Sequence, residues 1–161
     1  MTDTFTWRDR PVPPGPAVIV DLDGTLSDAA GRQHFLDRRP KDWRGFFAAC
    51  GDDPVLTQVA RLVECLDPEL AVVVLTARPT WVQEATVAWL ERFTIRWDLL
   101  VMREEGDYRP SPDAKREAVR ALQGVGFELR LAVDDDPRNA QMFEKEGIPC
   151  LYVHSGYYSS P

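Results

Sequence analysis

Short apolar runs alternate along this chain with segments in which apolar residues recur at every third or fourth position. The apolar runs cover residues 17–21, 71–76, 99–102, 129–134 and 149–153. They are continuous and rich in Val and Leu, which predicts strands that are buried on both faces. The alternation of strands with helices predicts an α/β, Rossmann-like fold in which helices flank a central parallel sheet.

The helices are predicted from the spacing of the apolar residues. Stripes at helical spacing run through residues 56–66, 82–89 and 114–122, and we assign them to the core rather than to function. A last helix is predicted from Pro137 to Glu146, because proline favours the start of a helix and Gly147 favours its end.

Residues 27–54 fit this alternation poorly. One short helix is predicted here, at residues 42–50. We expect this segment to be a small cap, inserted after the first strand, over the carboxyl edge of the sheet, where open α/β sheets bind ligands. Residues 1–16 are polar and proline-rich, so we expect a single domain over residues 17–161 that carries this cap.

The composition narrows the class of protein. With 44% hydrophobic and 28% charged residues, the chain resembles folded globular proteins rather than disordered or membrane proteins. Its N-terminal segment has no apolar stretch of the secretory kind, so we expect a cytoplasmic protein without membrane contact. The net charge of −7 argues against a protein that coats nucleic acid, although it allows a local basic cleft. Cys50, Cys65 and Cys150 form no ligand pattern, and we expect buried, reduced thiols.

Polar side chains gather where the predicted strands end. A single aspartate at such a position is commonly a turn or helix-cap residue. Several carboxylates at one edge of a parallel sheet repel each other unless a cation lies among them, and their hard oxygen ligands suit Mg²⁺. We therefore expect Mg²⁺ as a cofactor. The residues, in the order of the first four strands, are Asp21 and Asp23; Thr76 and Arg78; Arg103, Arg109 and Lys115; and Asp134, Asp135 and Asp136.

The same edge carries groups that suit an anion. Thr76, Arg78 and Lys115 offer hydrogen-bond donors and positive charge, for which phosphate is the obvious ligand. A metal ion, a cationic group and a carboxylate together are what phosphoryl transfer requires. One of the carboxylates can attack phosphorus and form an aspartyl-phosphate.

The segments DLDGTLSD, LTARPT, Lys115 and AVDDDP, in this order, resemble the four motifs of the haloacid dehalogenase (HAD) superfamily of Mg²⁺-dependent phosphotransferases. The resemblance implies that Asp21 is the nucleophile and that Asp23 is the general acid and base. It implies that Lys115 steadies the nucleophile and the phosphorus. An acid two residues after the nucleophile is typical of the phosphatases of the superfamily and disfavours dehalogenation.

The resemblance also implies roles for the remaining motif residues. The Mg²⁺ ligands would be Asp21, the backbone carbonyl of Asp23, Asp134 and Asp135. Gly24 would permit the bend that brings both catalytic carboxylates to one phosphate. The other assignments are a phosphate contact for Thr76 and Ala77, orientation of Asp23 for Thr25, and an N-cap of the last helix for Asp136.

A narrower resemblance concerns the substrate. DGTLSDAAGR, VMREEGDYR and LAVDDDPRNAQMFEKEGIPCLYVHSGYY are similar to the 3′-phosphatase domains of bacteriophage polynucleotide kinase/phosphatases. The implied substrates are 3′-phosphorylated DNA or RNA ends, or nucleoside 3′-monophosphates. The implied substrate or phosphate contacts are Arg32, Arg78, Arg103 and Arg109. Because the sequence contains no GxxxxGK[ST], we expect any kinase or ligase partner to be a separate chain; a homo-oligomer is left open.

Two local features have alternative interpretations. Trp43, Phe46 and Phe47 lie among the basic residues of 38–44, and they either stack a base or pack the cap helix onto the core. Arg103 and Arg109 either contact substrate or pair with the acidic residues of 104–107. For the whole chain, the alternatives are a small-molecule phosphatase for a 5′-nucleotide or sugar phosphate, and a noncatalytic phosphate-binding module.

Overall fold

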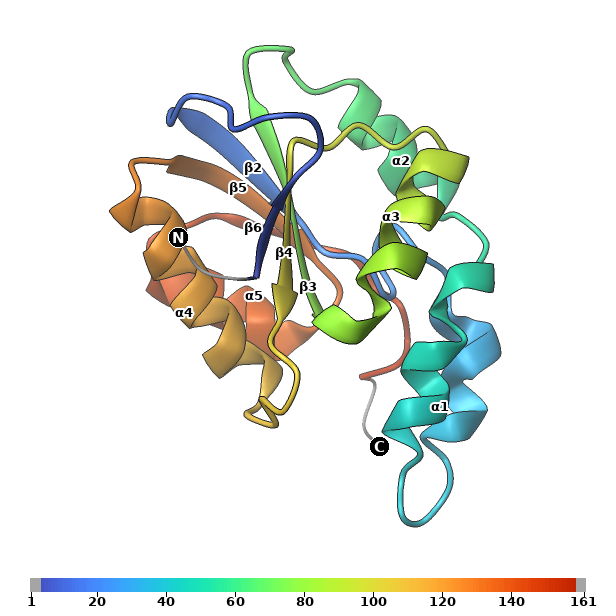
Figure 1. Ribbon diagram of the computed structural model, residues 1–161. Coiled ribbons are helices and arrows are strands. Elements are labelled where there is room, and N and C mark those ends of the chain that lie inside the picture. Colours follow the sequence, from blue (N-terminus) through green and yellow to red (C-terminus); the bar gives the residue numbers. More distant parts are fainter. Residues whose placement is uncertain (1–3, 159–161) are drawn as a thin grey trace.

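The computed structural model describes residues 4–158, which form a six-stranded sheet with helices on both faces (Figure 1). The strand order is β1-β4-β3-β2-β5-β6, and β2 to β6 pair in parallel. This confirms the predicted α/β fold and its parallel core. The strands are β1 Phe5–Trp7, β2 Pro16–Val20, β3 Ala71–Pro79, β4 Leu99–Arg103, β5 Glu128–Asp134 and β6 Cys150–Tyr152.

The helices form one layer on each face of the sheet (Figure 1). Alternate residues of the central strand β2 explain the two layers, because Val18 and Val20 belong to the core under α2 and α3, whereas Ala17 and Ile19 belong to the core under α4 and α5. The helices are α1 Trp43–Ala48, α2 Thr57–Glu64, α3 Gln83–Arg92, α4 Ser111–Gly124 and α5 Pro137–Lys145, with short 3-10 helices η1 Ala29–Phe35, η2 Cys50–Asp52 and η3 Thr80–Val82.

Strand β1 was not predicted. It is only three residues long and lies within the polar, proline-rich segment, so its pattern is too short to read as a strand. It pairs antiparallel with β4, and Phe5 and Trp7 pack against the core under α4. The sheet is therefore mixed, and residues 5–7 of the expected N-terminal segment belong to it. Residues 1–3 of that segment, and residues 159–161 of the expected domain, lie outside the described residues.

The residues that we predicted to mark the two ends of the last helix are confirmed. Asp136 caps α5, because its side chain accepts a hydrogen bond from the Arg138 amide, and Gly147 follows the helix with a φ of 80°. The prediction for the thiols was partly wrong. Cys50 is buried, but Cys65 is exposed and Cys150 is half-buried. Cys65 is exposed because it lies at the C-terminal end of α2, where the chain reaches the surface.

Residues 27–54, which we call the insertion segment, contain η1, α1 and η2. In Figure 1, η1 and α1 project from the body of the molecule, below α3 and beyond the ends of the parallel strands. Phe46 and Phe47 of α1 pack inward, against Arg32 and the core respectively, whereas Trp43 is exposed. None of the helices within residues 4–158 is long and apolar enough to cross a membrane.

Candidate active site

The register of the central strands brings the sequence-predicted residues to one edge of the sheet. Val20 at the end of β2 pairs with Val74 of β3 and with Val133 of β5. Asp21 and Asp134 come directly after the paired residues, and Thr76 comes two residues after Val74. The three residues consequently lie near one another at the carboxyl edge. Each is at most 6% exposed, so their charges and hydrogen bonds act in a poorly solvated environment.

A tight turn follows Asp21 and directs Asp23 to the same edge. The carbonyl of Leu22 accepts hydrogen bonds from three successive amides, those of residues 25–27. Gly24 has a φ of 83°, and a Cβ at this position would clash with the carboxylate of Asp135. Glycine is therefore required here both by the backbone conformation and by the close approach of Asp135.

Lys115 of α4 connects two of the carboxylates. Its Nζ lies 2.9 Å from Asp21 and 2.6 Å from Asp134, and its side chain is buried. Burial alone would lower the pKa of Lys115, but Asp134 and Asp21 raise it above its usual value, so that the ammonium stays charged. Thr25, which we expected to orient Asp23, instead donates a hydrogen bond of 3.0 Å to Asp21. The turn explains this difference, because it folds residue 25 back over residue 21.

The residues at the ends of β2 and β5 fit a divalent cation. Asp21, Asp134 and Asp135 each offer a carboxylate oxygen, and these oxygens lie within 4.8 Å of one another. Oδ2 of Asp135 is buried and has no hydrogen-bond partner among the described residues. Three buried carboxylates beside one ammonium leave an excess of negative charge, which a cation would balance. Asn139, which sequence reasoning missed, holds Asp134 in place through its Nδ2, 3.2 Å from both oxygens.

The pKa values of Asp21 and Asp135 reflect the same excess of negative charge. Burial raises the pKa of Asp21 well above its usual value, and the charges of Asp134 and Asp135 add to this effect against the opposing attraction of Lys115. Burial, together with the charge of Asp134, raises the pKa of Asp135 to about 6. A bound cation would favour the ionised carboxylates and reverse both shifts.

Asp23 lies in a different environment, between two arginines. Its Oδ1 is 2.6 Å from the guanidinium of Arg32 and 2.7 Å from that of Arg78. Burial acts to raise the pKa of Asp23, but the two guanidinium groups outweigh it and lower the pKa below the usual value. The side chains of Arg32 and Arg78 are 3% and 0% exposed. These two residues, which we expected to contact substrate or phosphate, are thus seen to hold Asp23.

A second carboxylate, which sequence reasoning missed, completes this arrangement. Asp53 of the insertion segment accepts hydrogen bonds from Arg32 at 2.8 and 2.6 Å, accepts one from the Ser27 hydroxyl, and lies 3.6 Å from Arg78. Arg32, Arg78, Asp23 and Asp53 therefore form a largely buried network without net charge, in which Asp23 is partly exposed. Asp53 is in an irregular segment, and its position near other acidic residues gave no signal of this role.

Comparison with known proteins agrees with this geometry. Residues 15–158 match the family model HAD_PNKP, described as the polynucleotide kinase PNKP phosphatase domain. The chain belongs to this family of phosphatase domains. The membership confirms the resemblance to HAD phosphatases that the four sequence motifs carried.

Domains similar to this one occur within longer chains in solved structures. A chain in the structure of the Pnkp1/Rnl/Hen1 RNA repair complex is 29% identical with a TM-score of 0.75, over 96% of the domain and 47% of that chain. A second structure of the Pnkp1/Rnl/Hen1 complex gives 29% identity and a TM-score of 0.74, over 96% and 50%. The domain thus spans about half the length of these chains. A predicted phosphatase from Clostridium acetobutylicum shares the fold, with 19% identity and a TM-score of 0.62 over 92% of the domain and 88% of that chain.

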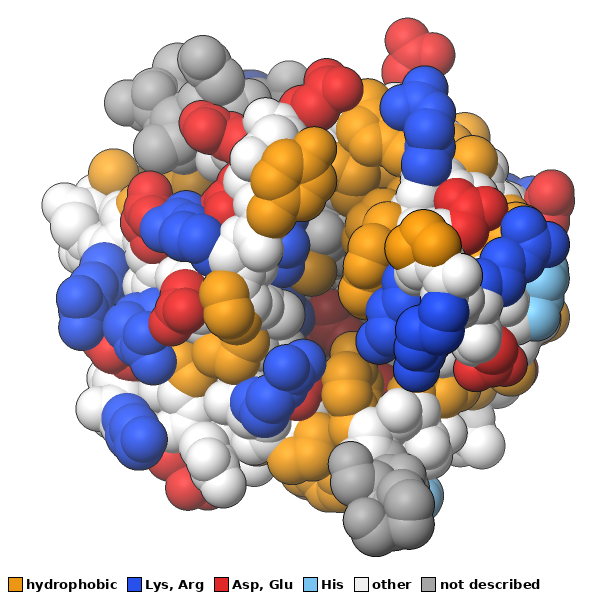
Figure 2. All heavy atoms as spheres, turned by 90° about the horizontal axis from the view of Figure 1, so that it is seen from below, with side chains coloured by type: hydrophobic (Ala, Val, Ile, Leu, Met, Phe, Trp, Pro, Cys, Tyr) orange, Lys and Arg blue, Asp and Glu red, His pale blue; other side chains and the backbone are white. Residues whose placement is uncertain are grey.

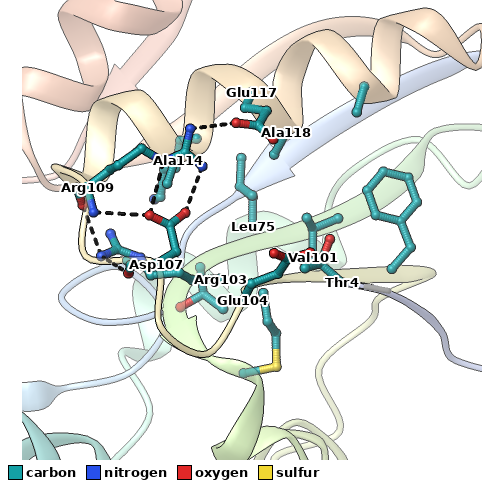
Figure 3. A pocket seen from close by; sticks show the side chains of 16 residues that line it. Thr4, Leu75, Val101, Arg103, Glu104, Asp107, Arg109, Ala114, Glu117 and Ala118 are labelled. Atoms are coloured by element: carbon teal, nitrogen blue, oxygen red, sulfur yellow. Dashed lines mark hydrogen bonds and ion pairs between the residues drawn. The ribbon is translucent and has the colours of Figure 1, made fainter. Parts of the chain in front are cut away.

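The remaining candidate residues of the phosphatase domain surround a pocket of about 110 Å³ beside Lys115, lined in part by Thr76 and Ala77 (Figure 3). Arg109 reaches between Asp107 and Glu117, with ion pairs of 2.7 and 2.6 Å. Arg103 donates to the backbone carbonyls of Asp107 and Arg109. Of the two interpretations of these arginines, the pairing with Asp107 is confirmed for Arg109, and both side chains brace the loop before α4.

Figure 2 shows the face of the phosphatase domain at the carboxyl ends of the parallel strands. A hollow opens near its centre, acidic side chains are visible at the bottom, and basic side chains lie on both sides of it (Figure 2). A chain with a net charge of −7 therefore presents positive charge around the entrance to its buried carboxylates. This distribution favours the approach of an anionic substrate.

Proposed function

We propose that this phosphatase domain is a Mg²⁺-dependent polynucleotide 3′-phosphatase that acts through an aspartyl-phosphate on Asp21. The observation that carries the proposal is that the buried Asp21 and the partly exposed Asp23 lie in different environments. Asp21 is held by Lys115 and Thr25 beside the acidic cluster, whereas Asp23 is held by Arg32 and Arg78. Two carboxylates in such different environments suit a nucleophile and a general acid and base.

The chemistry divides into two displacements. In the first, a carboxylate oxygen of Asp21 attacks phosphorus, the bond from phosphorus to the 3′ oxygen breaks, and Asp23 gives its proton to that oxygen. In the second, Asp23 takes a proton from water, the water oxygen attacks phosphorus, and the acyl-phosphate bond breaks to release inorganic phosphate. Lys115 keeps Asp21 oriented and offsets the negative charge that gathers around phosphorus.

Asp23 must change its protonation state during these steps. The two guanidinium groups keep its pKa low, which favours the carboxylate that the second step requires as a base. An incoming phosphate dianion brings negative charge close to Asp23 and acts in the opposite direction, which favours its protonation for the first step. The arginines thus hold the side chain of Asp23 in place, while the bound substrate raises its pKa.

Mg²⁺ fits the proposal through Asp21, Asp134 and Asp135, with the backbone carbonyl of Asp23 as a further ligand, since the side chain of Asp23 is engaged by the arginines. When bound there, it would neutralise charge on the phosphate oxygens. Thr76 and Ala77, which line a pocket together with Lys115, are proposed to contact the phosphate itself.

Metal binding should stabilise the fold. We expect Mg²⁺ at a hundredfold excess over its Kd to raise the melting temperature of the EDTA-treated protein by ~5–10 °C. Because the pKa of metal-free Asp135 is raised to about 6, protons compete with Mg²⁺ at low pH, and the gain should be larger at pH 8 than at pH 5. Differential scanning fluorimetry measures both. An unchanged melting temperature, together with full activity in EDTA, would contradict the metal site.

A panel of substrates tests the proposed activity. We expect 3′-phosphorylated oligonucleotides to show a higher kcat/KM than the matching nucleoside 3′-monophosphates and than 5′-phosphorylated oligonucleotides, and we expect added NaCl to lower it. RNA and DNA versions both belong in the panel, because the similar solved chains come from an RNA repair complex. Equal rates for short and long substrates, without salt dependence, would point instead to a small-molecule phosphatase.

The solved structures also bear on the proteins with which this domain acts. Chains similar to this domain are found in the solved Pnkp1/Rnl/Hen1 complexes. This supports the proposal that the domain works together with a ligase that acts on the same ends.

A further inference from the structure

Two tryptophans of this chain are exposed although the other large aromatic residues near them are covered. Trp43, the first residue of α1, is 49% exposed, and Trp81 in η3 is 37% exposed. Each has a cation over its ring: Lys41 Nζ lies 5.7 Å from the ring centroid of Trp43, and the guanidinium carbon of Arg44 lies 5.0 Å from that of Trp81. Exposed aromatic rings beside cations are the combination that single-stranded nucleic-acid binding sites use.

Both tryptophans lie on the side of the site where Asp23 is held. The ring of Trp43 contacts that of Phe46 edge-on, with 5.9 Å between centroids, and Phe46 in turn lies 4.3 Å below the guanidinium of Arg32. Trp81 follows β3, the strand that carries Arg78, and Arg44 joins it to α1. Arg32 and Arg78 are the two residues that hold Asp23, so each tryptophan is a short chain of contacts away from it.

The position of Asp23 fixes the direction in which a polynucleotide leaves the site. The general acid must touch the 3′ oxygen, and this oxygen is attached to the terminal sugar. The phosphorus lies on the opposite side, toward Asp21 and Lys115. The nucleotides on the 5′ side of the scissile bond therefore emerge past Asp23, toward the insertion segment and η3.

We propose that Trp43 and Trp81, with Lys41 and Arg44, form a stacking platform for the nucleotides that precede the 3′-terminal phosphate. The inference rests on the proposed function and deepens it, since it names single-stranded 3′ ends as the preferred class of substrate. Aromatic rings stack on any base without regard to sequence, and the adjacent cations meet the phosphodiesters of the strand. A paired end would offer no free base face to either ring.

The test compares a long substrate with a short one. In Trp43→Leu and Trp81→Leu, we expect KM for a single-stranded 3′-phosphorylated hexanucleotide to rise about tenfold, with kcat unchanged. Hydrolysis of p-nitrophenyl phosphate, which reaches only the phosphate site, should stay at the level of the native chain. Tyrosine at either position should restore KM for the hexanucleotide, because it also presents an aromatic face.

Tyr152→Leu is the matched control, because this aromatic residue is 44% exposed but lies on β6, at the far edge of the sheet. It should leave both substrates unaffected. Normal p-nitrophenyl phosphate turnover in the tryptophan variants shows that they are folded. An unchanged hexanucleotide KM in both variants would then overturn the platform but not the proposed function. A native chain that hydrolyses the aryl phosphate but no 3′-phosphorylated oligonucleotide would overturn the proposed function, and the platform with it.

A binding measurement completes the test for a variant that is too slow to assay. On an Asp21→Asn background, the 3′-phosphorylated hexanucleotide should quench tryptophan fluorescence, because Trp43 and Trp81 are the exposed tryptophans in the described part of the chain. Leucine at both positions should remove most of this quenching and weaken binding. Quenching that persists in the double variant would contradict the platform.

Discussion

Asp21→Asn should reduce turnover of every phosphomonoester by about 10⁴-fold or more, because the amide cannot form the phosphoenzyme. The change is nearly isosteric: the amide oxygen can still accept from Lys115, and the amide nitrogen then faces Thr25, whose hydroxyl can accept from it. The folded state raises the pKa of Asp21, so its ionised form costs stability as the pH rises through that value. At pH 8 and without metal, the variant should therefore melt no lower than the native chain, even though it is inactive. Steady-state assays and thermal melts of the same preparation measure both effects.

The matched control is Asp136→Asn, which alters another buried aspartate at the same edge of the sheet. Asp136 caps α5 and pairs with Arg138, and asparagine is an equally good cap. This variant should retain its activity. If Asp21→Asn kept more than about one per cent of the native rate, the covalent route through Asp21 would be wrong.

Asp53→Ala should be the most destabilising single change outside the hydrophobic core. It removes the partner of Arg32 from a site where both side chains are less than 5% exposed, and it leaves a buried guanidinium with Asp23 alone. Breaking a buried pair in this way costs about 3–5 kcal/mol. For a chain of this length the melting temperature should fall by at least ~6 °C. Turnover should fall as well, because Arg32 is one of the two groups that position Asp23.

The neighbouring residue offers the control. Asp52→Ala changes the same residue type one position earlier, but its side chain is exposed, so its effect should stay within about 0.5 kcal/mol. Chemical denaturation of both variants gives the comparison. Equal stability of the Asp53 and Asp52 variants would show that the buried network contributes nothing to folding.

The strands and the gathering of carboxylates at their ends could be predicted because their signals are local. A continuous apolar run such as residues 71–76 identifies a buried strand wherever it occurs, and a parallel sheet gathers the residues at the ends of such runs. The segment DLDGT adds a glycine whose conformation is needed at that position. Strand β1 could not be recognised, because three residues at a sheet edge carry no period and depend on β4 for their pairing.

The partners of Arg32 and Arg78 could not be predicted, and those of Arg109 were only one of two interpretations, because an arginine near an anionic site suits a phosphate and a carboxylate equally well. Burial and distance decide between them: Arg78 is fully buried against Asp23, whereas Arg109 forms exposed ion pairs on the loop before α4. Asp53 and Trp81 were missed for a related reason. Their significance depends on Arg32 and Arg44, which are distant in sequence and come close only in the folded chain.

The buried network around Asp23 also bears on how such domains can be recombined. Asp23 and Arg78 belong to the sheet and its loops, whereas Arg32 and Asp53 belong to the insertion segment. The sheet with its loops thus supplies one positive and one negative charge, and the insertion segment supplies another such pair. Each pair is electrically neutral by itself. An insertion segment exchanged between related phosphatases would carry its own counter-ion with it. The exchange would then alter substrate preference without leaving an unpaired charge around Asp23.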